Sequence, residues 1–317
     1  MRPNENIFDS LRSGTRHRLD LRVDESISLP VLVAAGSSQG KTLVVTANVH
    51  GDEYEGVRAI FEIFDELDPT VMAGRLIAVP IANPPAFWNG SRTSPLDGLN
   101  LARIMPGRAG GSASEKIAFT LARDVIGGAD FYLDLHSGGI AYQMPTMVGF
   151  SARNEQSHAA AEIFGAPVVW GHKDIAPGRT ISWAEASKIP WLYTEARGAG
   201  RIHPYDLTVM KTGIRNLLMH LKILPGRPSL ARIEWRLEGD GNIDAGLTAT
   251  KAGFLLHTVR LLQKVSAGEV LGTLVSPLGE LLEEYRASRD GVVAMVRELP
   301  VVKPGDSLFL LANYETS

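Results

Sequence analysis

Two histidines and one glutamate stand where strands are expected to end. His50 and Glu53 follow one apolar, β-branched run, and His136 follows a second apolar run; a glycine comes soon after each histidine. Glycine allows the backbone to turn sharply at these points. Two imidazoles and a carboxylate supply three ligands to zinc and leave its fourth position open for water, which is the arrangement of a catalytic site. The pattern therefore predicts that His50, Glu53 and His136 bind one Zn²⁺ per chain.

A further carboxylate ends a third apolar run. Glu195 follows the strand-like segment 190–194 and would lie at the same edge of a sheet as the predicted ligands. Hydrolysis at a metal needs a base that takes a proton from water and returns it to the leaving amine, and a glutamate suits that role. The alternative is a simple ion pair with Arg197. We favour the catalytic interpretation.

Two aspartates lie next to the predicted ligands. Asp52 and Asp134 are placed where a carboxylate can fix the tautomer of a metal-bound imidazole. For Asp52 the alternative, a cap on the adjacent turn, is equally consistent with the pattern.

Two arginines lie in a long segment rich in Gly, Ser and Pro, residues 89–111. Loops of this length inside a compact domain are usually functional or disordered. Arg92 and Arg103 are its candidates for chemistry. Most loop arginines are solvated, but near a metal a guanidinium can polarise a carbonyl or bind a carboxylate in two places. Their position in the loop alone does not distinguish a solvated arginine from one that acts near the metal.

The elements that would position these residues alternate between strands and helices. Such alternation predicts an α/β fold with a mostly parallel sheet flanked by helices, in which ligands bind beyond the carboxyl ends of the strands. The expected strands are 28–35, 42–46, 75–81, 131–135, 146–150, 166–170 and 190–195; the expected helices are 56–67, 114–126, 154–164, 180–187 and 204–224.

The pattern changes after Pro228. Short strands separated by Gly and Asp turns predict a smaller all-β module at 229–317, following a catalytic domain at 1–228. The spacing resembles the biotinyl/lipoyl-type fold, but the segment 280–289, where that family carries its modified lysine, contains no lysine. We therefore interpret the module as a cap or an oligomerisation surface, in a protein that could form homo-oligomers.

Composition excludes several classes of function. The 317 residues carry a net charge of −3 with no basic block, which argues against nucleic acid or an anionic membrane as a partner. The absence of cysteine excludes disulfides and thiolate metal ligands. There is no apolar core of a signal peptide, and no apolar run reaches the ~20 residues that span a bilayer. We expect a soluble, cytoplasmic protein.

Two motif matches around residues 35–42 are rejected. Residues 36–40 match the nucleophile-elbow string, and the segment ending in Gly40-Lys41-Thr42 matches a loose phosphate-loop string. Both motifs need a helix directly afterwards. Because a strand is expected instead, we interpret 36–40 as a hairpin turn between two strands. A nucleotide hydrolase remains a competing hypothesis that predicts a helix there.

Three motifs together resemble the succinylglutamate desuccinylase/aspartoacylase family, a branch of the zinc carboxypeptidase-like enzymes. They are N-V-H-G-D-E at 48–53, L-D-L-H-S-G-G at 133–139 and T-E-A-R-G at 194–198. The resemblance covers about residues 40–225 and implies zinc held by the predicted ligands, with Glu195 promoting attack of the zinc water. It implies hydrolysis of an amide bond in a small N-acylated amino acid or similar metabolite. It also implies that Arg92 polarises the carbonyl and that Arg103 binds the substrate carboxylate.

One departure from the family pattern concerns the substrate. The family usually has L-N-R-x-F-P-G, whereas residues 101–107 read L-A-R-I-M-P-G. The methyl group of Ala102 cannot donate a hydrogen bond to a carboxylate. Asn100, two residues earlier, is a candidate to compensate as a substrate-binding residue. Two alternatives stay open: a non-catalytic zinc- or ligand-binding protein on this scaffold, and a small-peptide carboxypeptidase.

Overall fold

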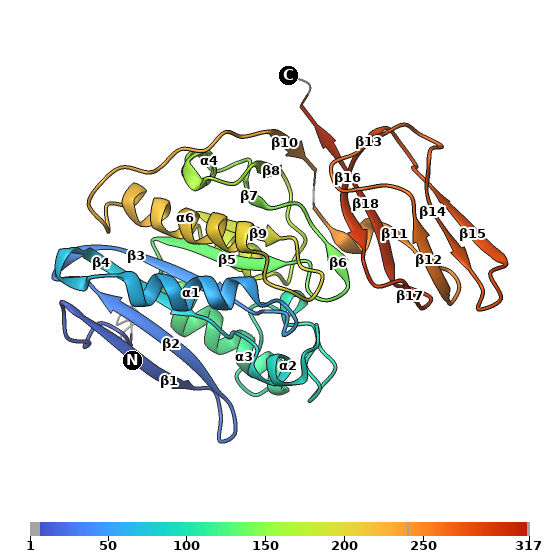
Figure 1. The fold of residues 1–317 in the computed structure, drawn as a ribbon. Coiled ribbons are helices and arrows are strands. Elements are labelled where there is room, and N and C mark those ends of the chain that lie inside the picture. The colour runs from blue at the N-terminus through green and yellow to red at the C-terminus, as the bar shows by residue number, and fades with distance from the viewer. Residues whose placement is uncertain (1–6, 240, 316–317) are drawn as a thin grey trace.

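A large mixed sheet forms the centre of the molecule in the computed structural model, which describes residues 7–239 and 241–315 (Figure 1). Twelve of its strands follow one another in the order β1-β2-β4-β3-β5-β9-β7-β8-β10-β18-β16-β13; β11 pairs with β18 and β6 with β16. The strands are β1 (Thr15–Arg22), β2 (Ser28–Ala35), β3 (Ser38–Ala47), β4 (Ala73–Val79), β5 (Phe131–Ser137), β6 (Tyr142–Gln143), β7 (Met147–Ser151), β8 (Val168–His172), β9 (Trp191–Ala196), β10 (Trp235–Glu238), β11 (Leu247–Thr248), β13 (Lys264–Val265), β16 (Gly291–Arg297) and β18 (Ser307–Tyr314).

The strands that lead to the predicted site are parallel, but the sheet as a whole is not. Strands β4, β3, β5 and β9 pair in parallel, and so do β7, β8 and β10. In contrast, β1–β2, β2–β4, β7–β9 and β10–β18 are antiparallel pairs. The expectation of a mostly parallel sheet is therefore corrected to a mixed sheet with a parallel centre.

The segment 36–40 leads from one strand into another, but these strands do not form a hairpin. Strand β4 lies between β2 and β3, so the hairpin expectation is wrong. The strand expected after Thr42 is confirmed, because β3 runs from Ser38 to Ala47. Neither the nucleophile elbow nor the phosphate loop has the helix it needs, which removes the structural basis for the nucleotide-hydrolase hypothesis.

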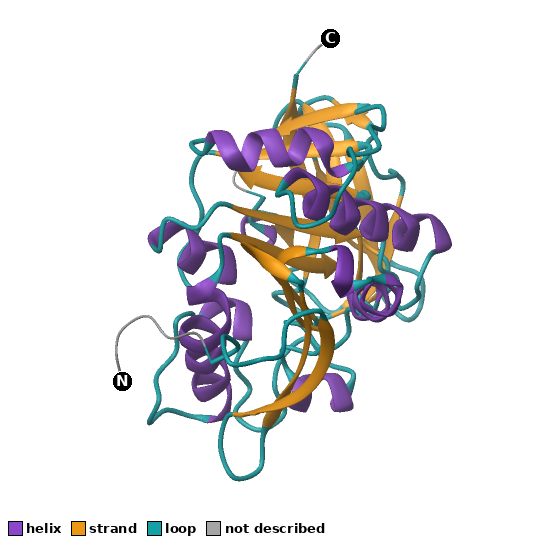
Figure 2. Ribbon diagram, turned by 90° about the vertical axis from the view of Figure 1, so that its left-hand side faces the viewer, coloured by secondary structure: helices purple, strands orange, loops and turns teal. Residues whose placement is uncertain are grey.

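Helices cover both faces of the parallel strands (Figure 2). Successive residues of β3 alternate: Leu43 and Val45 belong to the hydrophobic cluster that contains residues of α1, α4 and α6, whereas Val44 belongs to the cluster that contains residues of α3 and α5. This alternation is the period of two that a strand imposes on its side chains. The helices are α1 (Glu55–Glu66), α2 (Pro84–Asn89), α3 (Ala113–Thr120), α4 (Glu155–Phe164), α5 (Thr180–Ala186) and α6 (Pro204–His220). Among the described residues, no helix has both the length and the apolar character needed to cross a membrane.

Beyond position 228 the chain is rich in strands. A second, four-stranded sheet has the order β15-β14-β12-β17 and packs on β16 and β18 around buried Leu271, Leu274 and Phe309. Its strands are β12 (Gly253–His257), β14 (Val270–Val275), β15 (Leu281–Arg286) and β17 (Val301–Val302). Strand β10 pairs with both β8 and β18, so the large sheet continues across the predicted boundary at 228. The division into 1–228 and 229–317 stays a prediction.

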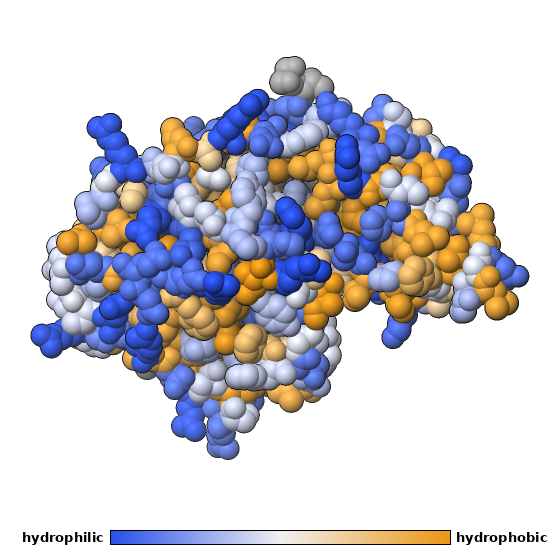
Figure 3. Space-filling model, viewed as in Figure 1, coloured by the Kyte–Doolittle hydropathy of each residue, from blue (hydrophilic) through white to orange (hydrophobic). Residues whose placement is uncertain are grey.

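The outer face of this four-stranded sheet is apolar. Phe254 on β12 lies between Val301 on β17 and Val275 on β14, and Leu281 on β15 continues the row. Phe254, Val301 and Leu281 are exposed, and Figure 3 shows apolar surface on this C-terminal part of the molecule. The predicted oligomerisation surface stays a prediction.

Candidate metal centre and adjoining pocket

The structure brings the three predicted metal ligands together. His50 and Glu53 lie just after β3 and His136 lies on β5, and the two strands are parallel neighbours with Ala47 opposite Leu135. One nitrogen of each histidine and one oxygen of Glu53 lie within 4.8 Å of one another. The side chains are buried or nearly so. The parallel pairing of two strands thus brings together residues that are far apart in the sequence.

The two imidazoles are oriented so that the same ring atom faces Glu53. Nδ1 of His50 lies 2.7 Å from Glu53 Oε1, and Nδ1 of His136 lies 2.9 Å from Oε2. The opposite atoms are also engaged: Nε2 of His50 lies 3.2 Å from Asn100 Oδ1, and Nε2 of His136 lies 3.0 Å from Asp134 Oδ2. If each Nε2 donates its proton outward, both Nδ1 lone pairs are left to face a metal. This donor set of two nitrogens and a carboxylate fits zinc.

Asp134 is the centre of a buried network behind His136. The side chain has no exposed surface, and its carboxylate accepts hydrogen bonds from Thr46 Oγ1 at 2.6 Å and from the Thr180 hydroxyl. Thr46 is in turn bonded to the Tyr132 hydroxyl. Two hydroxyl groups therefore hold the carboxylate in position, as expected for a group that orients a metal-bound imidazole.

Asp52 contacts the backbone of a turn that is distant in sequence. Its Oδ2 accepts a hydrogen bond from the backbone nitrogen of Ile140 at 3.1 Å, and the structure gives it no hydrogen bond to an imidazole. Asp52 thus caps the turn that follows His136. The two aspartates, which the sequence treats alike, have different neighbours.

The glycine after His50 lies in a turn and is required there by packing. A Cβ at Gly51 would lie 2.0 Å from the carbonyl carbon of Ala86 in α2, so no side chain fits there. The left-handed backbone conformation belongs instead to Asn48, with φ 57°. Its side-chain amide donates to the backbone oxygen of Glu53 at 2.9 Å and so holds the segment together. The expected turn at Gly51 is present, because the backbone nitrogen of Glu53 donates to the oxygen of His50 at 3.2 Å across it.

Burial and neighbouring charges shift the pKa values of all three ligands. Burial lowers the pKa of His50 to about 4, and the Arg92 guanidinium adds to this shift. Burial alone would raise the pKa of Glu53, but the two imidazoles outweigh it and hold that pKa well below its usual range. Burial alone would lower the pKa of His136, but Asp134 and Glu53 raise it well above the usual value. A metal cation bound between Glu53 and the two imidazoles would take the place of the proton that His136 otherwise holds.

Glu195 lies beside the ligand cluster on the next strand. It is opposite His136 in the β5–β9 register and is nearly fully buried. Its Oε2 atom has no hydrogen-bond partner among the described residues, and no ion pair with Arg197 is found there. Burial raises the pKa of Glu195 to about 8, and the charge of Glu53 acts in the same direction. The unpartnered oxygen is available to accept a proton.

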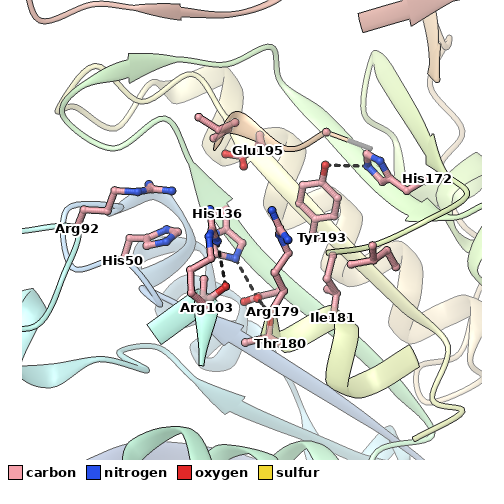
Figure 4. A pocket seen from close by; sticks show the side chains of 15 residues that line it. His50, Arg92, Arg103, His136, His172, Arg179, Thr180, Ile181, Tyr193 and Glu195 are labelled. Carbon is pink, nitrogen blue, oxygen red and sulfur yellow. Dashed lines mark hydrogen bonds and ion pairs between the residues drawn. The ribbon is translucent and has the colours of Figure 1, made fainter. Parts of the chain in front are cut away.

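Arg92 approaches the cluster from the segment after α2. The backbone nitrogen of Gly51 donates to the oxygen of Ser91 at 2.9 Å, which ties this segment to the His50 turn. The Arg92 guanidinium lies 3.4 Å from Glu53 Oε1 through Nη1. Figure 4 shows it beside His50, directed into the pocket.

A pocket with about 620 Å³ of empty space, part of it open to solvent, adjoins the cluster. Ala102 and Arg103 of the long loop line it, and Figure 4 labels Arg103. Binding of a substrate carboxylate by Arg103 stays a prediction. Asn100 does not line the pocket; its Oδ1 faces His50 and also accepts from the backbone nitrogen of Ala102 at 2.9 Å. Direct contact of Asn100 with a substrate carboxylate stays a prediction. The lining residues are His50, Arg92, Ala102, Arg103, Asp134, His136, His172, Ile175, Arg179, Thr180, Ile181, Tyr193, Glu195, Gly241 and Ile243.

Several lining residues were not singled out by the sequence. Tyr193 lies two residues before Glu195 on β9 and so shares its face, a signal that the period of a strand provides. Its hydroxyl lies 2.9 Å from Nε2 of His172. Arg179 comes directly before α5. Gly241 and Ile243 follow β10, far from any motif, and their place in the pocket depends on how the C-terminal segment folds back.

Comparison with known proteins agrees with this arrangement. The model of the succinylglutamate desuccinylase/aspartoacylase catalytic domain matches residues 39–221. The N-alpha-acetyl-L-2,4-diaminobutyric acid deacetylase of Halomonas elongata is 32% identical over 95% of this chain and 92% of that protein.

Solved structures extend the match. A succinylglutamate desuccinylase from Silicibacter sp. TM1040 is 30% identical, with a TM-score of 0.86 and 96% of each chain covered. The product-bound ectoine utilization protein EutE (DoeB) from Ruegeria pomeroyi is 29% identical, with a TM-score of 0.86 and 99% of each chain covered. The chain therefore belongs to the succinylglutamate desuccinylase/aspartoacylase family.

Proposed function

We propose that this protein is a zinc-dependent deacylase that hydrolyses the amide bond of a small N-acylated amino acid. The observation that carries the proposal is the cluster of His50, Glu53 and His136 at the edge of a pocket, with the buried carboxylate of Glu195 beside it. The likeness to a deacetylase of an N-acetylated diamino acid supports the class of substrate.

His50, Glu53 and His136 would hold the metal through Nδ1, a carboxylate oxygen and Nδ1. When bound, zinc supplies Lewis-acid chemistry: it polarises a carbonyl group and makes water more acidic. Asn100 and Asp134 keep the Nε2 atoms of the two rings occupied, and so keep the Nδ1 atoms facing inward.

Glu195 transfers the proton. Its Oε2 accepts a proton from the attacking water and later returns it to the nitrogen of the leaving amine. A carboxylate that is buried and lacks a hydrogen-bond partner holds a proton more strongly than a solvated one, which suits both halves of this task. The Arg92 guanidinium stabilises negative charge as it develops on the carbonyl oxygen.

Arg103 binds the carboxylate of the substrate's amino-acid part. Its side chain lines the same pocket as His50 and His136, so a bound amino acid would reach from the ligand cluster to Arg103 (Figure 4). A guanidinium matches a carboxylate with two parallel hydrogen bonds.

Metal analysis joined to an acetate-release assay tests the proposal. We expect about one zinc per chain in the wild type, as a site of three protein ligands predicts, and loss of zinc in the His136→Ala variant. A chelator should abolish hydrolysis of N-acetylated amino acids, and added zinc should restore it. A wild type that takes up no zinc would remove the metal centre, and a zinc-loaded protein that hydrolyses no N-acyl amino acid would favour a non-catalytic role.

A further inference from the structure

One wall of the pocket comes from a segment that follows β10. We call residues 241–246 the strap. Gly241 and Ile243 of the strap line the pocket. A Cβ at Gly241 would lie 2.6 Å from the Cε1 atom of His172, which also lines the pocket. The backbone of the strap is therefore so close to this side chain that only glycine fits at position 241. The strap thus forms part of the pocket wall.

Two polar contacts tie the strap to arginines of the pocket. Nε of Arg103 lies 2.9 Å from Oδ2 of Asp244, and Nη2 of Arg179 donates to Oδ1 of Asn242 at 2.7 Å. Both arginines line the pocket, and Figure 4 labels their side chains there. The polar side chains of the strap therefore meet the guanidinium groups that line this wall.

Asp244 brings a negative charge into a basic surrounding. Burial would raise its pKa, but Arg103, Arg179 and Arg92 outweigh burial and lower it, so the side chain is ionised. The other carboxylates of this region have tasks already: Glu53 faces the two imidazoles, and Asp134 accepts from two hydroxyls. Glu195 also lines the pocket, but it lies opposite His136 and carries the proton transfer in the proposed reaction. Asp244 is therefore a carboxylate near the pocket wall that has no role in the proposed chemistry and can serve a cationic ligand.

The contact with Arg103 uses only part of the Asp244 carboxylate. The side chain is 58% exposed, and the described residues offer no hydrogen bond to its Oδ1. An ionised carboxylate has about four lone-pair sites and can serve two cations at once. Arg103 and Asp244 together thus present a positive and a negative group side by side, next to the wall that Arg103 and Ile243 form.

We infer that this pair recognises an amino acid whose side chain carries an ammonium group. Arg103 binds the α-carboxylate, and Asp244 binds the side-chain ammonium, so the substrate class is an N-acylated diamino acid with one free amine. A derivative of aspartate or glutamate would place a second carboxylate against Asp244, and like charges at short range select against such a ligand. The inference rests on the proposed deacylase function and assigns its specificity to Asp244.

The Asp244→Asn variant tests this assignment, because it keeps the shape and removes the charge. We would compare kcat/KM for Nα-acetyl-L-2,4-diaminobutyrate with that for Nα-acetyl-L-2-aminobutyrate, which lacks the amine. We expect the wild type to prefer the diamino substrate and the variant to lose about tenfold or more of that preference, as for a charge-assisted hydrogen bond. Asp244→Glu should retain much of the preference. Asp174→Asn is the matched control, because Asp174 is an exposed partner of Arg153 at 2.8 Å, and it should change nothing.

Calorimetry on the zinc-loaded protein gives a second measurement that needs no turnover. L-2,4-Diaminobutyrate should bind to the wild type more tightly than L-2-aminobutyrate, and Asp244→Asn should reduce the difference. Equal preference in wild type and variant, or a wild type that favours N-acetylaspartate, would overturn the inference and leave the deacylase function intact. If no N-acyl amino acid is hydrolysed, the function fails, and the binding difference still decides the role of Asp244.

Discussion

Replacing Asp134 by asparagine should weaken zinc binding by about ten- to hundredfold, the loss typical of a removed partner of a metal-ligating histidine. The carboxylate has no exposed surface and accepts from His136 Nε2 at 3.0 Å and from Thr46 Oγ1 at 2.6 Å. An asparagine oxygen can still accept from His136, but the acceptor is then neutral. Hydrogen bonds to charged groups are worth about 1.5–3 kcal/mol against about 0.5–1.5 kcal/mol for neutral ones. The difference of roughly 1–2 kcal/mol corresponds to about tenfold in affinity for each 1.4 kcal/mol.

Competition with a chelating dye measures this loss directly. The control is Asp206→Asn, because Asp206 is equally buried and accepts from Thr146 Oγ1 at 2.6 Å and from the backbone nitrogen of Arg197 at 2.9 Å. Both variants should be less stable than the wild type, but only Asp134→Asn should bind zinc more weakly. Unchanged zinc affinity in Asp134→Asn, or an equal loss in the control, would refute the role of the carboxylate in orienting His136.

Three further predictions concern the site and its surroundings. Glu195→Gln should retain zinc but lose about 10²–10⁴-fold in kcat/KM, the usual contribution of a general base, in steady-state assays with the metal content checked. In metal-free protein, the pKa of Glu195 is raised to about 8 in the folded state, so its stabilising contribution is present at low pH and lost as pH rises toward that value. Denaturation at about pH 5 and about pH 8 should therefore show Glu195→Gln gaining stability relative to the wild type at the higher pH. Gly51→Ala places a Cβ 2.0 Å from the carbonyl carbon of Ala86 and should cost about 1–3 kcal/mol, seen as a lower Tm. Gly110→Ala, where nothing lies within 4 Å, should stay within about 0.5 kcal/mol of the wild type.

The ligand cluster could be predicted because each of its residues lies at or just after the end of an apolar run. Such runs indicate buried strands, and the carboxyl ends of parallel neighbours meet at one edge of the sheet. His136 and Glu195 occupy opposite positions on β5 and β9, as that argument requires. The apolar runs in the sequence were therefore sufficient to place these residues, because each of them lies at or just after the end of a strand.

The order and direction of the strands could not be predicted in the same way. The run at 28–35 and the run at 42–46 are adjacent in sequence, yet β4 lies between β2 and β3. Strand β9 pairs in parallel with β5 on one side, but β7 on its other side runs antiparallel to it. Pairing partners depend on long-range packing that no short window of sequence contains, so the mixed character of the sheet was missed.

The pocket wall was missed for a related reason. Asp244 follows no motif, and its place near Arg103 depends on β10 pairing with β8 and β18. Asn100 shows the opposite difficulty, because its spacing from Ala102 suggested contact with substrate, whereas its Oδ1 faces His50. A position in a loop predicts proximity to a site but not the direction in which a side chain points.

The pairing of β10 with β18 also has a consequence for the order of events during synthesis. Residues of the ligand cluster and Glu195 are made well before Tyr314, which lies opposite Leu237 in that pair. At ~5–20 residues per second, roughly 6–24 s separate the synthesis of the two regions. A nascent chain can therefore pair β3, β5 and β9, and so bring the ligand cluster and Glu195 together, before β18 pairs with β10. The strap follows β10, so under our proposal for Asp244 the ligand cluster would be assembled before the part of the site that selects among substrates is complete.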